Sequence, residues 1–388
     1  MNILIISDNY PSNRMPNKGA FVYNLVQELS QYHKITVIAP FKVHDLLKSK
    51  SKGYGEERCK VYRPLYFSFS NKRFLGINSG SWSRHLKARA VNKCITDLSV
   101  KPDIIYAHFI QNAWFDFNYL EEYSIPLVIA SGESSYSFLK KIPKKFLQNL
   151  KDHTNHFICV SGANKKGLTE AGLDENKMSI IPNAVDYSLF KPLDKNTCKA
   201  QLGIPYNAFV VGFVGNFIHR KGPNRIIEAI KQLADQDIQL VCVGGKDNLI
   251  SNNFPKTIPP VPNYQLPGIY NAFDIFVLPT LSEGHCNAIE EAKACCIPIV
   301  SSLGTSVEGQ IDSTTGILLD PLKIDEIAAA IQKLKNNNTI RRSMEESLKL
   351  KRGEQSLKDR AQKISTLLEN IVIDSRKANN KRRSLERI

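Results

Sequence analysis

The sequence predicts an α/β protein with two domains, and three observations support this prediction. The chain has 388 residues, which is more than a single hydrophobic core usually organises. Short apolar strands alternate with amphipathic helices along most of the chain, as in sheets whose parallel strands are joined by helices. A strand, a polar loop with a glycine and a helix follow one another near the N-terminus and again from residue 209. Each half of the chain therefore begins a unit of this kind.

The N-terminal unit places a glycine where a ligand can approach the backbone. Residues 3–6 form a buried strand and residues 33–40 form the next one, with a helix between them that begins near Gly19, so the three elements make a right-handed βαβ unit. A glycine at the helix start lets backbone amides approach a diphosphate or an acceptor, because a side chain there would hold the ligand away. An ordinary flexible loop is the alternative interpretation.

Charge and cysteine content restrict the class of protein. The formal net charge of +15 predicts an anionic partner such as nucleic acid, an acidic membrane surface or a phosphorylated substrate. No apolar stretch reaches the length that spans a bilayer, and the apolar start of the chain is too short for a signal peptide, so we expect a cytoplasmic protein. The eight cysteines lack the spacing of zinc or redox motifs, which predicts buried thiols.

Two strands of the first domain end in residues of possible functional interest. Residues 103–107 form a strand that leads into His108, and open α/β sheets bind ligands at the carboxyl ends of their strands. A single histidine is more often a structural residue, so this position alone decides little. Residues 126–130 form the next strand, which Ser131, Gly132 and Glu133 follow.

Residues 138–151 combine apolar and basic side chains at roughly helical spacing. A basic amphipathic helix is typical of segments that lie on an anionic membrane. A solvated helix whose apolar side packs on the sheet fits the same pattern. The sequence favours neither interpretation over the other.

The second domain begins with a strand that is followed by two adjacent cations. Residues 209–214 form an apolar strand, and Arg220 and Lys221 lie in the loop between it and the next helix. Two cations before a helix start suit a diphosphate. Ordinary surface charges are the alternative, which this location makes less favourable.

The segment 278–300 contains a strand, a glycine loop, a helix and a second strand. Asn287 and Glu290 have the spacing of a capping box, which predicts a helix that starts directly after Asn287. Glu283 in the loop and Glu291 in the first helical turn would then flank a helix N-terminus that favours a phosphate, and a carboxylate in this place suits ribose hydroxyls. Taken alone, two such acids would more often be a solvated loop residue and a residue that offsets the helix dipole.

This segment resembles the signature of the retaining family 4 glycosyltransferases, which have the GT-B fold. The signature places a glutamate, seven residues and a second glutamate within Pro-Ser/Thr-x-x-Glu-Gly and Glu-Ala-x-Ala-x-Gly-x-Pro-x-Val. Residues 279–300 match nearly every defined position, except that Cys296 stands where the family usually has glycine. Residues 180–192 are similar to the family's Pro-Asn-Gly-Val-Asp and Phe-x-Pro segment. The resemblance covers nearly the whole chain.

The resemblance implies an α/β protein of the GT-B fold, with two Rossmann-like domains facing a cleft and a C-terminal helix crossing back to the first domain. The implied parts are an acceptor-side domain at residues 1–192, a nucleotide-sugar-binding domain at 193–352, a crossover helix at 353–375 and a basic tail at 376–388. The charge pattern of this tail predicts disorder.

The resemblance also implies roles for individual residues. The implied catalytic residues are His108, Arg220, Lys221 and Glu283. The implied donor-binding residues are Gly19, Gly215, Asn216, Val261, Pro262, His285, Cys286, Asn287, Ala288 and Glu291. In the family, a histidine at the end of the strand contacts the donor sugar, and an arginine and a lysine neutralise the leaving phosphates. Asn216 occupies a place often held by that arginine, so Arg220 is the candidate for the second cation. Glu133 is a candidate to replace an aspartate that many relatives have after the preceding strand.

We therefore expect a retaining glycosyltransferase that moves a hexose or N-acetylhexosamine from a nucleotide diphosphate sugar, with UDP favoured, to a lipid-linked or polysaccharide acceptor in cell-surface glycan synthesis. No cofactor and no metal site are expected, because the only Asp-x-Asp triplet, residues 235–237, precedes its strand, whereas a metal-dependent GT-A transferase has it after a strand. The expected partners are the nucleotide sugar, a polyprenyl-linked or polysaccharide acceptor and an anionic membrane surface on the inner face of the cytoplasmic membrane, without nucleic acid.

Other classes explain the sequence less well. A nicotinamide dehydrogenase would have Gly-x-Gly-x-x-Gly between a strand and a helix, and this chain does not. A nucleic-acid-binding protein would explain the charge, but the chain has no recognised module of that kind. A GT-B-like sugar-nucleotide epimerase shares the fold and the diphosphate site. This epimerase and a non-catalytic polyanion-binding protein are the alternative functions that the sequence leaves open.

Overall fold

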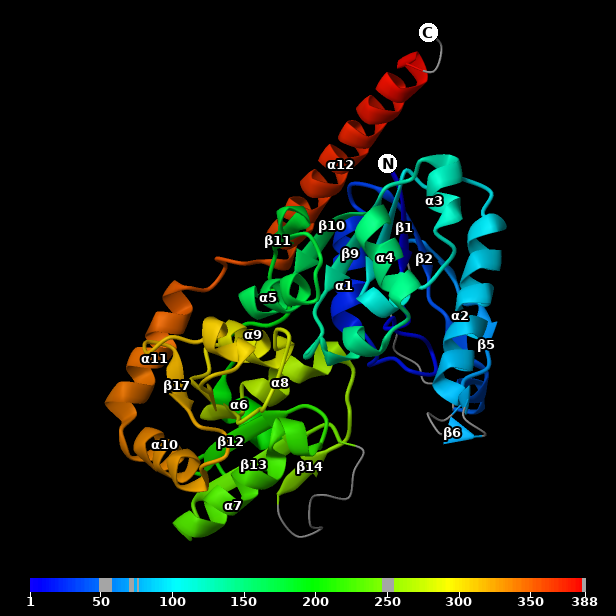
Figure 1. The fold of residues 1–388 in the computed structure, drawn as a ribbon. Coiled ribbons are helices and arrows are strands. Elements are labelled where there is room, and N and C mark those ends of the chain that lie inside the picture. The colour runs from blue at the N-terminus through cyan, green and yellow to red at the C-terminus, as the bar shows by residue number, and fades with distance from the viewer. Residues whose placement is uncertain (49–57, 70–72, 75–76, 246–254, 386–388) are drawn as a thin grey trace. The chain divides into compact units, whose positions relative to one another are not determined.

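The computed structural model describes residues 1–48, 58–69, 73–74, 77–245 and 255–385. The chain forms two compact units, Met1–Pro182 with Lys358–Ile388 and Asn183–Leu357 (Figure 1). The division follows residue 182, whereas the sequence analysis placed it after residue 192. Residues of the intervening segment belong to the second unit because Val185 forms a bridge with Ser356 and the Asn183 side chain donates to Asn287.

Within the described residues, the first unit has a seven-stranded parallel sheet with the order β11-β10-β9-β8-β1-β2-β4. Its strands are β1 (Asn2–Ile6), β2 (Lys34–Ile38), β4 (Lys60–Tyr62), β8 (Ile104–His108), β9 (Leu127–Ser131), β10 (Thr154–Cys159) and β11 (Met178–Ile180). Two short pairs lie outside this sheet: β3 (Phe41–Lys42) with β5 (Leu65–Tyr66), and β6 (Arg73–Phe74) with β7 (Ile77–Asn78). The parallel arrangement confirms the predicted βαβ organisation.

The two faces of this sheet carry separate cores because side chains alternate along a strand. Ile3 and Ile5 of β1 belong to one core, and Leu4 and Ile6 belong to the other. The first face packs against α1 (Ala20–Leu29) and α12 (Leu357–Leu385). The second face packs against α2 (Ser79–Thr96), α3 (Asn118–Tyr123), α4 (Lys144–His153) and α5 (Gly162–Glu170).

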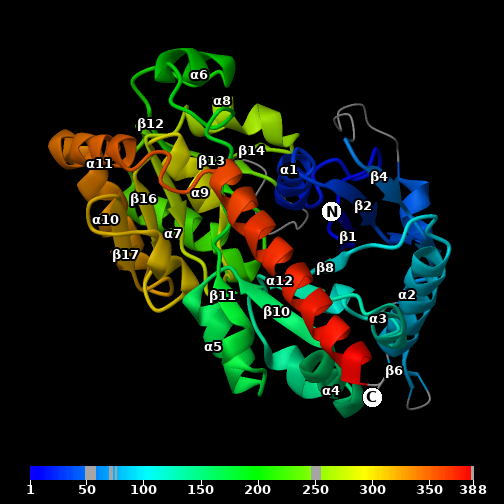
Figure 2. The ribbon, with the colours of Figure 1, turned by 90° about the horizontal axis from the view of Figure 1, so that it is seen from above.

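The C-terminal helix continues through the basic segment. Helix α12 runs without interruption from Leu357 to Leu385 (Figures 1 and 2, red). This stretch contains neither proline nor glycine, and the Arg376 guanidinium lies 2.5 Å from the Asp103 carboxylate. The prediction of a disordered tail is therefore wrong for residues 376–385, while the end of the tail, including Arg387, lies outside the described residues.

Helix α4 decides between the two interpretations of residues 138–151. Phe146 and Leu150 are buried in the core of the first unit, whereas Lys144, Lys145 and Lys151 are exposed. The apolar side of the helix is therefore used in packing against the sheet, and only its charged side faces solvent. None of the helices in the described part of the chain combines the length and the apolar character that crossing a bilayer requires.

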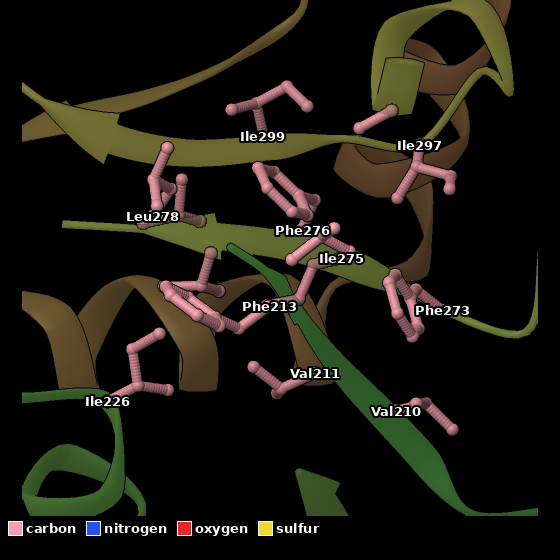
Figure 3. Close-up of a cluster of buried hydrophobic side chains, with 14 of the residues drawn as sticks. Val210, Val211, Phe213, Ile226, Phe273, Ile275, Phe276, Leu278, Ile297 and Ile299 are labelled. Atoms are coloured by element: carbon pink, nitrogen blue, oxygen red, sulfur yellow. The ribbon is translucent and has the colours of Figure 1, made fainter. Parts of the chain in front are cut away.

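The second unit has, within the described residues, a six-stranded parallel sheet with the order β14-β13-β12-β15-β16-β17. Its strands are β12 (Phe209–Val214), β13 (Ile238–Val243), β14 (Lys256–Ile258), β15 (Ile275–Leu278), β16 (Ile299–Ser302) and β17 (Gly316–Leu319). Its helices are α6 (Lys195–Gln201), α7 (Pro223–Leu233), α8 (Leu266–Tyr270), α9 (Asn287–Ala294), α10 (Ile324–Asn336) and α11 (Asn338–Leu350). Figure 3 shows Phe213 and Phe276 of the central strands together with Ile226 of α7 in one buried cluster.

The cysteines are free thiols, as predicted, although Cys59 and Cys94 are partly exposed while the others are buried. Cys296 follows α9 with a φ of 59°. This left-handed conformation costs a residue with a Cβ free energy that glycine does not lose. The glycine that the family signature has at this position avoids this cost, whereas this chain has Cys296 there.

Candidate active site

Two loops meet at the carboxyl edge of the second sheet. Strands β12 and β15 are parallel neighbours, so the loops that follow them leave the sheet side by side. The Leu281 N–H donates to the carbonyl of Arg220 at 2.8 Å, and the Thr280 hydroxyl donates to the same oxygen at 3.3 Å. These bonds hold the two predicted cations beside the loop that carries Glu283.

Glu283 lies between the two cations. The Arg220 Nη1 and the Lys221 Nζ each lie 2.9 Å from the same carboxylate oxygen, Oε1. The side chains of Lys221 and Glu283 are 14% and 11% exposed, while that of Arg220 is 34% exposed. Burial lowers the pKa of Lys221, but the neighbouring Glu283 carboxylate opposes this effect, and the pKa is raised. Lys221 therefore carries its charge throughout the physiological range.

Glycines allow this loop to fold closely over the sheet. Gly215 has a φ of 153°, and a Cβ on it would lie 3.1 Å from the Lys221 side chain. Gly222 has a φ of 77°, and a Cβ on it would lie 2.5 Å from the Pro279 carbonyl oxygen. A side chain at Gly222 would push the two loops apart, and one at Gly215 would press on the Lys221 side chain. Asn216, between them, is exposed.

Arg225 is a positioning residue that the sequence analysis missed. It lies in the first turn of α7 and is 7% exposed. Its guanidinium donates to the carbonyls of His219 at 3.0 Å and Pro279 at 2.6 Å, so it ties the cation loop to the loop after β15. The sequence offered one signal, which is an arginine among the apolar residues of this helix.

The N-terminus of α9 is capped differently from the prediction. The helix begins at Asn287, and its N-cap residue is Cys286 without a side-chain bond. The Gln310 side chain accepts from the Cys286 N–H at 2.8 Å and donates to the carboxylate of Glu290 at 2.8 Å. The predicted capping box is therefore wrong, because the Asn287 side chain accepts from Asn183 and the Glu290 carboxylate accepts from Gln310. Glu290, rather than Glu291, is the acidic residue of the first turn.

Gln310→Ala is expected to lower the free energy of unfolding by about 2–3 kcal/mol, because a buried N–H and a buried carboxylate each lose a partner. Urea denaturation followed by circular dichroism measures the change. Gln265→Ala, at an exposed position, serves as the control and is expected to stay within about 0.5 kcal/mol of the unaltered protein. Equal stability of the two variants would contradict this account of the cap.

Glu291 has its own polar partners in the same unit. The Tyr270 hydroxyl donates to its Oε2 at 2.8 Å, and the Asn263 side chain lies 3.4 Å from its Oε1. Burial raises the pKa of Glu291 to about 7, although the bonds from Tyr270 and Asn263 oppose the shift. The Asn263 contact also brings the preceding residues, Val261 and Pro262, to the side of the second unit that carries Glu291.

The other predicted residues lie at the N-terminus of α9 or in the loop before it. The His285 imidazole lies 3.8 Å from the Glu290 carboxylate, with its side chain 6% exposed. Asn287 accepts from the Asn183 side chain at 3.0 Å. Ala288 is half-buried, and its carbonyl accepts from the Tyr270 hydroxyl at 3.3 Å. Cys286 is buried, and this burial raises its thiol pKa to about 11, so its sulfur is protonated.

His108 and Gly19 belong to the first unit. His108 ends β8 with 3% exposure, and its ring contacts Phe21 and Phe109. Burial, with a smaller effect of the Arg360 charge, lowers the pKa of His108 to about 3, so the imidazole is neutral. Gly19 precedes α1 with a φ of 68°, and a Cβ there would lie 1.9 Å from the Asn9 carbonyl oxygen.

Glu133 holds the loop that follows His108. Its carboxylate accepts from the Ile110 N–H at 2.9 Å and from the Ser131 hydroxyl at 2.6 Å. Burial raises its pKa. The residue thus links the chain after β8 to the chain after β9.

Two family models match the chain. Residues 194–351 match the model described as Glycosyl transferases group 1, and residues 19–189 match the model described as Glycosyltransferase Family 4. The chain belongs to the family 4 glycosyltransferases. This glycosyltransferase is 28% identical over 355 residues to TuaC of Bacillus subtilis (strain 168), whose name describes a glycosyltransferase of teichuronic acid biosynthesis, and the match covers 85% of this chain and 88% of TuaC.

Solved structures show that this glycosyltransferase has the GT-B fold. A sucrose-phosphate synthase from Thermosynechococcus elongatus superposes with a TM-score of 0.76 and 16% identity, covering 96% of this chain and 99% of that one. HepE from Anabaena in complex with UDP and glucose superposes with a TM-score of 0.72 and 18% identity, covering 95% and 99%. At these identities the likeness concerns the fold alone.

Proposed function

We propose that this glycosyltransferase moves a hexose or N-acetylhexosamine from a UDP-sugar to a lipid-linked or polysaccharide acceptor, with retention of the anomeric configuration. The observation that carries the proposal is the pair of cations on Glu283 at the end of β12 and β15. The likeness to HepE, which binds UDP and glucose, supports the choice of donor. The name of TuaC supports an acceptor in cell-surface glycan synthesis.

The geometry suggests how donor binding uses this cluster. Both cations bind one oxygen of Glu283. A diphosphate that takes the N–H groups of Arg220 and Lys221 releases this carboxylate, which then accepts hydrogen bonds from the sugar hydroxyls. As the bond between sugar and diphosphate breaks, negative charge grows on the leaving phosphate, and preorganised cations stabilise it. In this proposal, Glu291 accepts hydrogen bonds from the ribose hydroxyls.

Analysis of the product tests the proposal. The enzyme is incubated with a panel of UDP-sugars and a polyprenyl diphosphate-linked sugar acceptor, and proton NMR determines the anomeric configuration of the product. Retention is expected. An inverted product would overturn the assignment of a retaining enzyme. Conversion of the donor into an epimer in the absence of any acceptor would favour the epimerase instead.

Activity is expected to persist in excess chelator. Arg220 and Lys221 supply the positive charge that a divalent ion supplies in metal-dependent transferases. Initial rates in EDTA are compared with rates in EDTA plus manganese. Loss of transfer in EDTA with recovery on adding manganese would contradict this expectation.

The enzyme is expected to bind anionic membranes by charge alone. Lys140, Lys141, Lys144 and Lys145 are exposed, whereas the apolar residues beside them pack in the core. Each such lysine contributes roughly 1 kcal/mol near an anionic surface. Liposome flotation should therefore show binding to phosphatidylserine vesicles but not to neutral vesicles, and the binding should disappear at high salt.

Charge reversal at these four lysines is expected to abolish flotation. The matched control replaces four exposed lysines of the second unit with glutamate, namely Lys191, Lys231, Lys333 and Lys349. Equal loss in both variants would mean that net charge, and not this surface, determines binding. Equal recovery with anionic and neutral vesicles would refute membrane binding by charge.

A further inference from the structure

The first unit has a group of charged side chains at the carboxyl end of β1 that the proposed donor chemistry does not use. Asp8 follows β1, Lys18 precedes α1, and Lys42 ends β3. Asp45 lies in the short helical turn Val43–Leu47, and Lys87 comes from α2. Five separate segments thus place ionisable groups near one edge of the sheet.

Each of the two acids in this group has a lysine partner. The Lys87 Nζ lies 2.8 Å from the Asp8 carboxylate and 2.7 Å from the Asn112 side-chain oxygen. The Asn112 amide in turn donates to the other oxygen of Asp8 at 3.2 Å. The Lys48 Nζ lies 2.5 Å from the Asp45 carboxylate. Both acids of the group are therefore neutralised by other lysines.

Lys18 and Lys42 have no ion-pair partner among the described residues. Lys18 is half-buried, and its charge interacts with those of Lys42 and Lys87 as well as with Asp8 and Asp45. Burial is the largest cause that lowers the pKa of Lys18, and the charges of Lys42 and Lys87 add to it. Asp8 and Asp45 oppose this lowering without cancelling it, so a bound anion would stabilise the two lysine charges further.

Tyr66 adds a hydroxyl to this place. It pairs with Lys42 in the β3–β5 ladder, and it is 7% exposed. Burial and the charges of Asp8 and Asp45 raise its pKa well above the usual value. The hydroxyl is therefore protonated and can donate a hydrogen bond to an oxyanion.

The loop that carries Lys18 is held close to the sheet. Gly19 has a left-handed φ of 68°, and its backbone lies against the Asn9 carbonyl so tightly that a Cβ would approach it to 1.9 Å. Because Lys18 directly precedes this contact, its backbone position is set before any ligand binds. A preorganised cation loses less freedom on binding than one on a free loop.

We propose that Lys18, Lys42 and the Tyr66 hydroxyl bind a phosphate group of the acceptor. This inference rests on the proposed function, since it identifies the acceptor as an anion. Lysine ammonium groups bind phosphate as point charges, whereas a carboxylate is recognised best by the planar fork of arginine. The subsite therefore favours a diphosphate-linked carrier or a sugar phosphate over an acidic sugar.

Titration calorimetry with inorganic diphosphate tests the subsite. The full-length enzyme is first saturated with UDP, so that the cations of the second unit are occupied. Diphosphate is expected to bind the unaltered enzyme, and Lys18→Gln/Lys42→Gln should weaken this binding by about tenfold or more. Lys18→Arg/Lys42→Arg keeps both charges and should retain it. Lys34→Gln/Lys93→Gln, at exposed positions of the same unit, should match the unaltered enzyme.

Three outcomes would overturn the proposal. They are the absence of diphosphate binding to the unaltered enzyme, equal affinity of the two glutamine variants, and competition by glucuronate that exceeds competition by diphosphate. A circular dichroism melt of each variant shows whether it is folded. Failure of the proposed function is recognised separately, because the unaltered enzyme would then not bind UDP. Diphosphate titration of Arg220→Ala/Lys221→Ala tests the subsite in that case.

Discussion

Replacing Lys221 with alanine is expected to lower kcat for sugar transfer by about 10²–10³-fold, the effect of removing one preorganised group from a developing negative charge. The change in KM for the donor should be small, because Arg220 remains to bind the diphosphate. The buried position of Lys221, beside Glu283 and over Gly215, makes its charge more effective than that of an exposed lysine. Steady-state kinetics with a UDP-sugar measures both constants.

Glu283→Gln serves as the matched variant. It keeps the shape of the side chain but removes the negative charge that both cations contact. UDP should bind this variant more tightly, while kcat falls because the sugar hydroxyls lose a carboxylate acceptor. If Lys221→Ala raised KM without lowering kcat, the lysine would contribute to ground-state binding and not to the transition state.

Donor affinity is expected to fall as the pH is lowered through 7, because the pKa of Glu291 is raised by burial to about 7. Below this pH the carboxyl is protonated and accepts hydrogen bonds poorly, so KM for the UDP-sugar should rise about tenfold between pH 8 and pH 6. Glu291→Gln should bind the donor about tenfold more weakly or worse at pH 8. It should also lose the pH dependence, with little change in kcat.

Tyr270→Phe sharpens this test. The hydrogen bond from Tyr270 to Glu291 stabilises the charged carboxylate and lowers its pKa. Removing the hydroxyl should therefore move the midpoint of the KM profile to higher pH. A midpoint that stays in place in Tyr270→Phe, or a pH dependence that persists in Glu291→Gln, would assign the titration to another group.

The chemistry of the second unit could be predicted from the sequence because it depends on local order. The glutamates of the signature follow one strand, and the two cations follow its neighbour, so a parallel sheet brings them together without further information. The same holds for the strands themselves, whose apolar runs are buried on both faces.

The features that the sequence analysis missed depend on residues distant in sequence or on competing partners. The capping box had the correct spacing, but the Glu290 carboxylate accepts from the distant Gln310 and the Asn287 side chain accepts from the distant Asn183. Arg225 acquires its role only when the loop after β15 is in place. The basic tail has the composition of a disordered segment, yet it continues a helix whose earlier turns pack in a core.

The packing of α12 has a consequence for the order in which the protein is completed during synthesis. Ala361, Ile364, Leu368 and Val372 cover the face of the first sheet that contains Ile3 and Ile5. The ribosome makes these residues roughly 10–40 s after residue 182 at about 5–20 residues per second. The second unit, which is continuous from Asn183 to Leu357, is made within this interval and does not need α12 in order to fold. The first sheet therefore waits for a helix that is made after the second unit, and until then α1 covers only part of this apolar face.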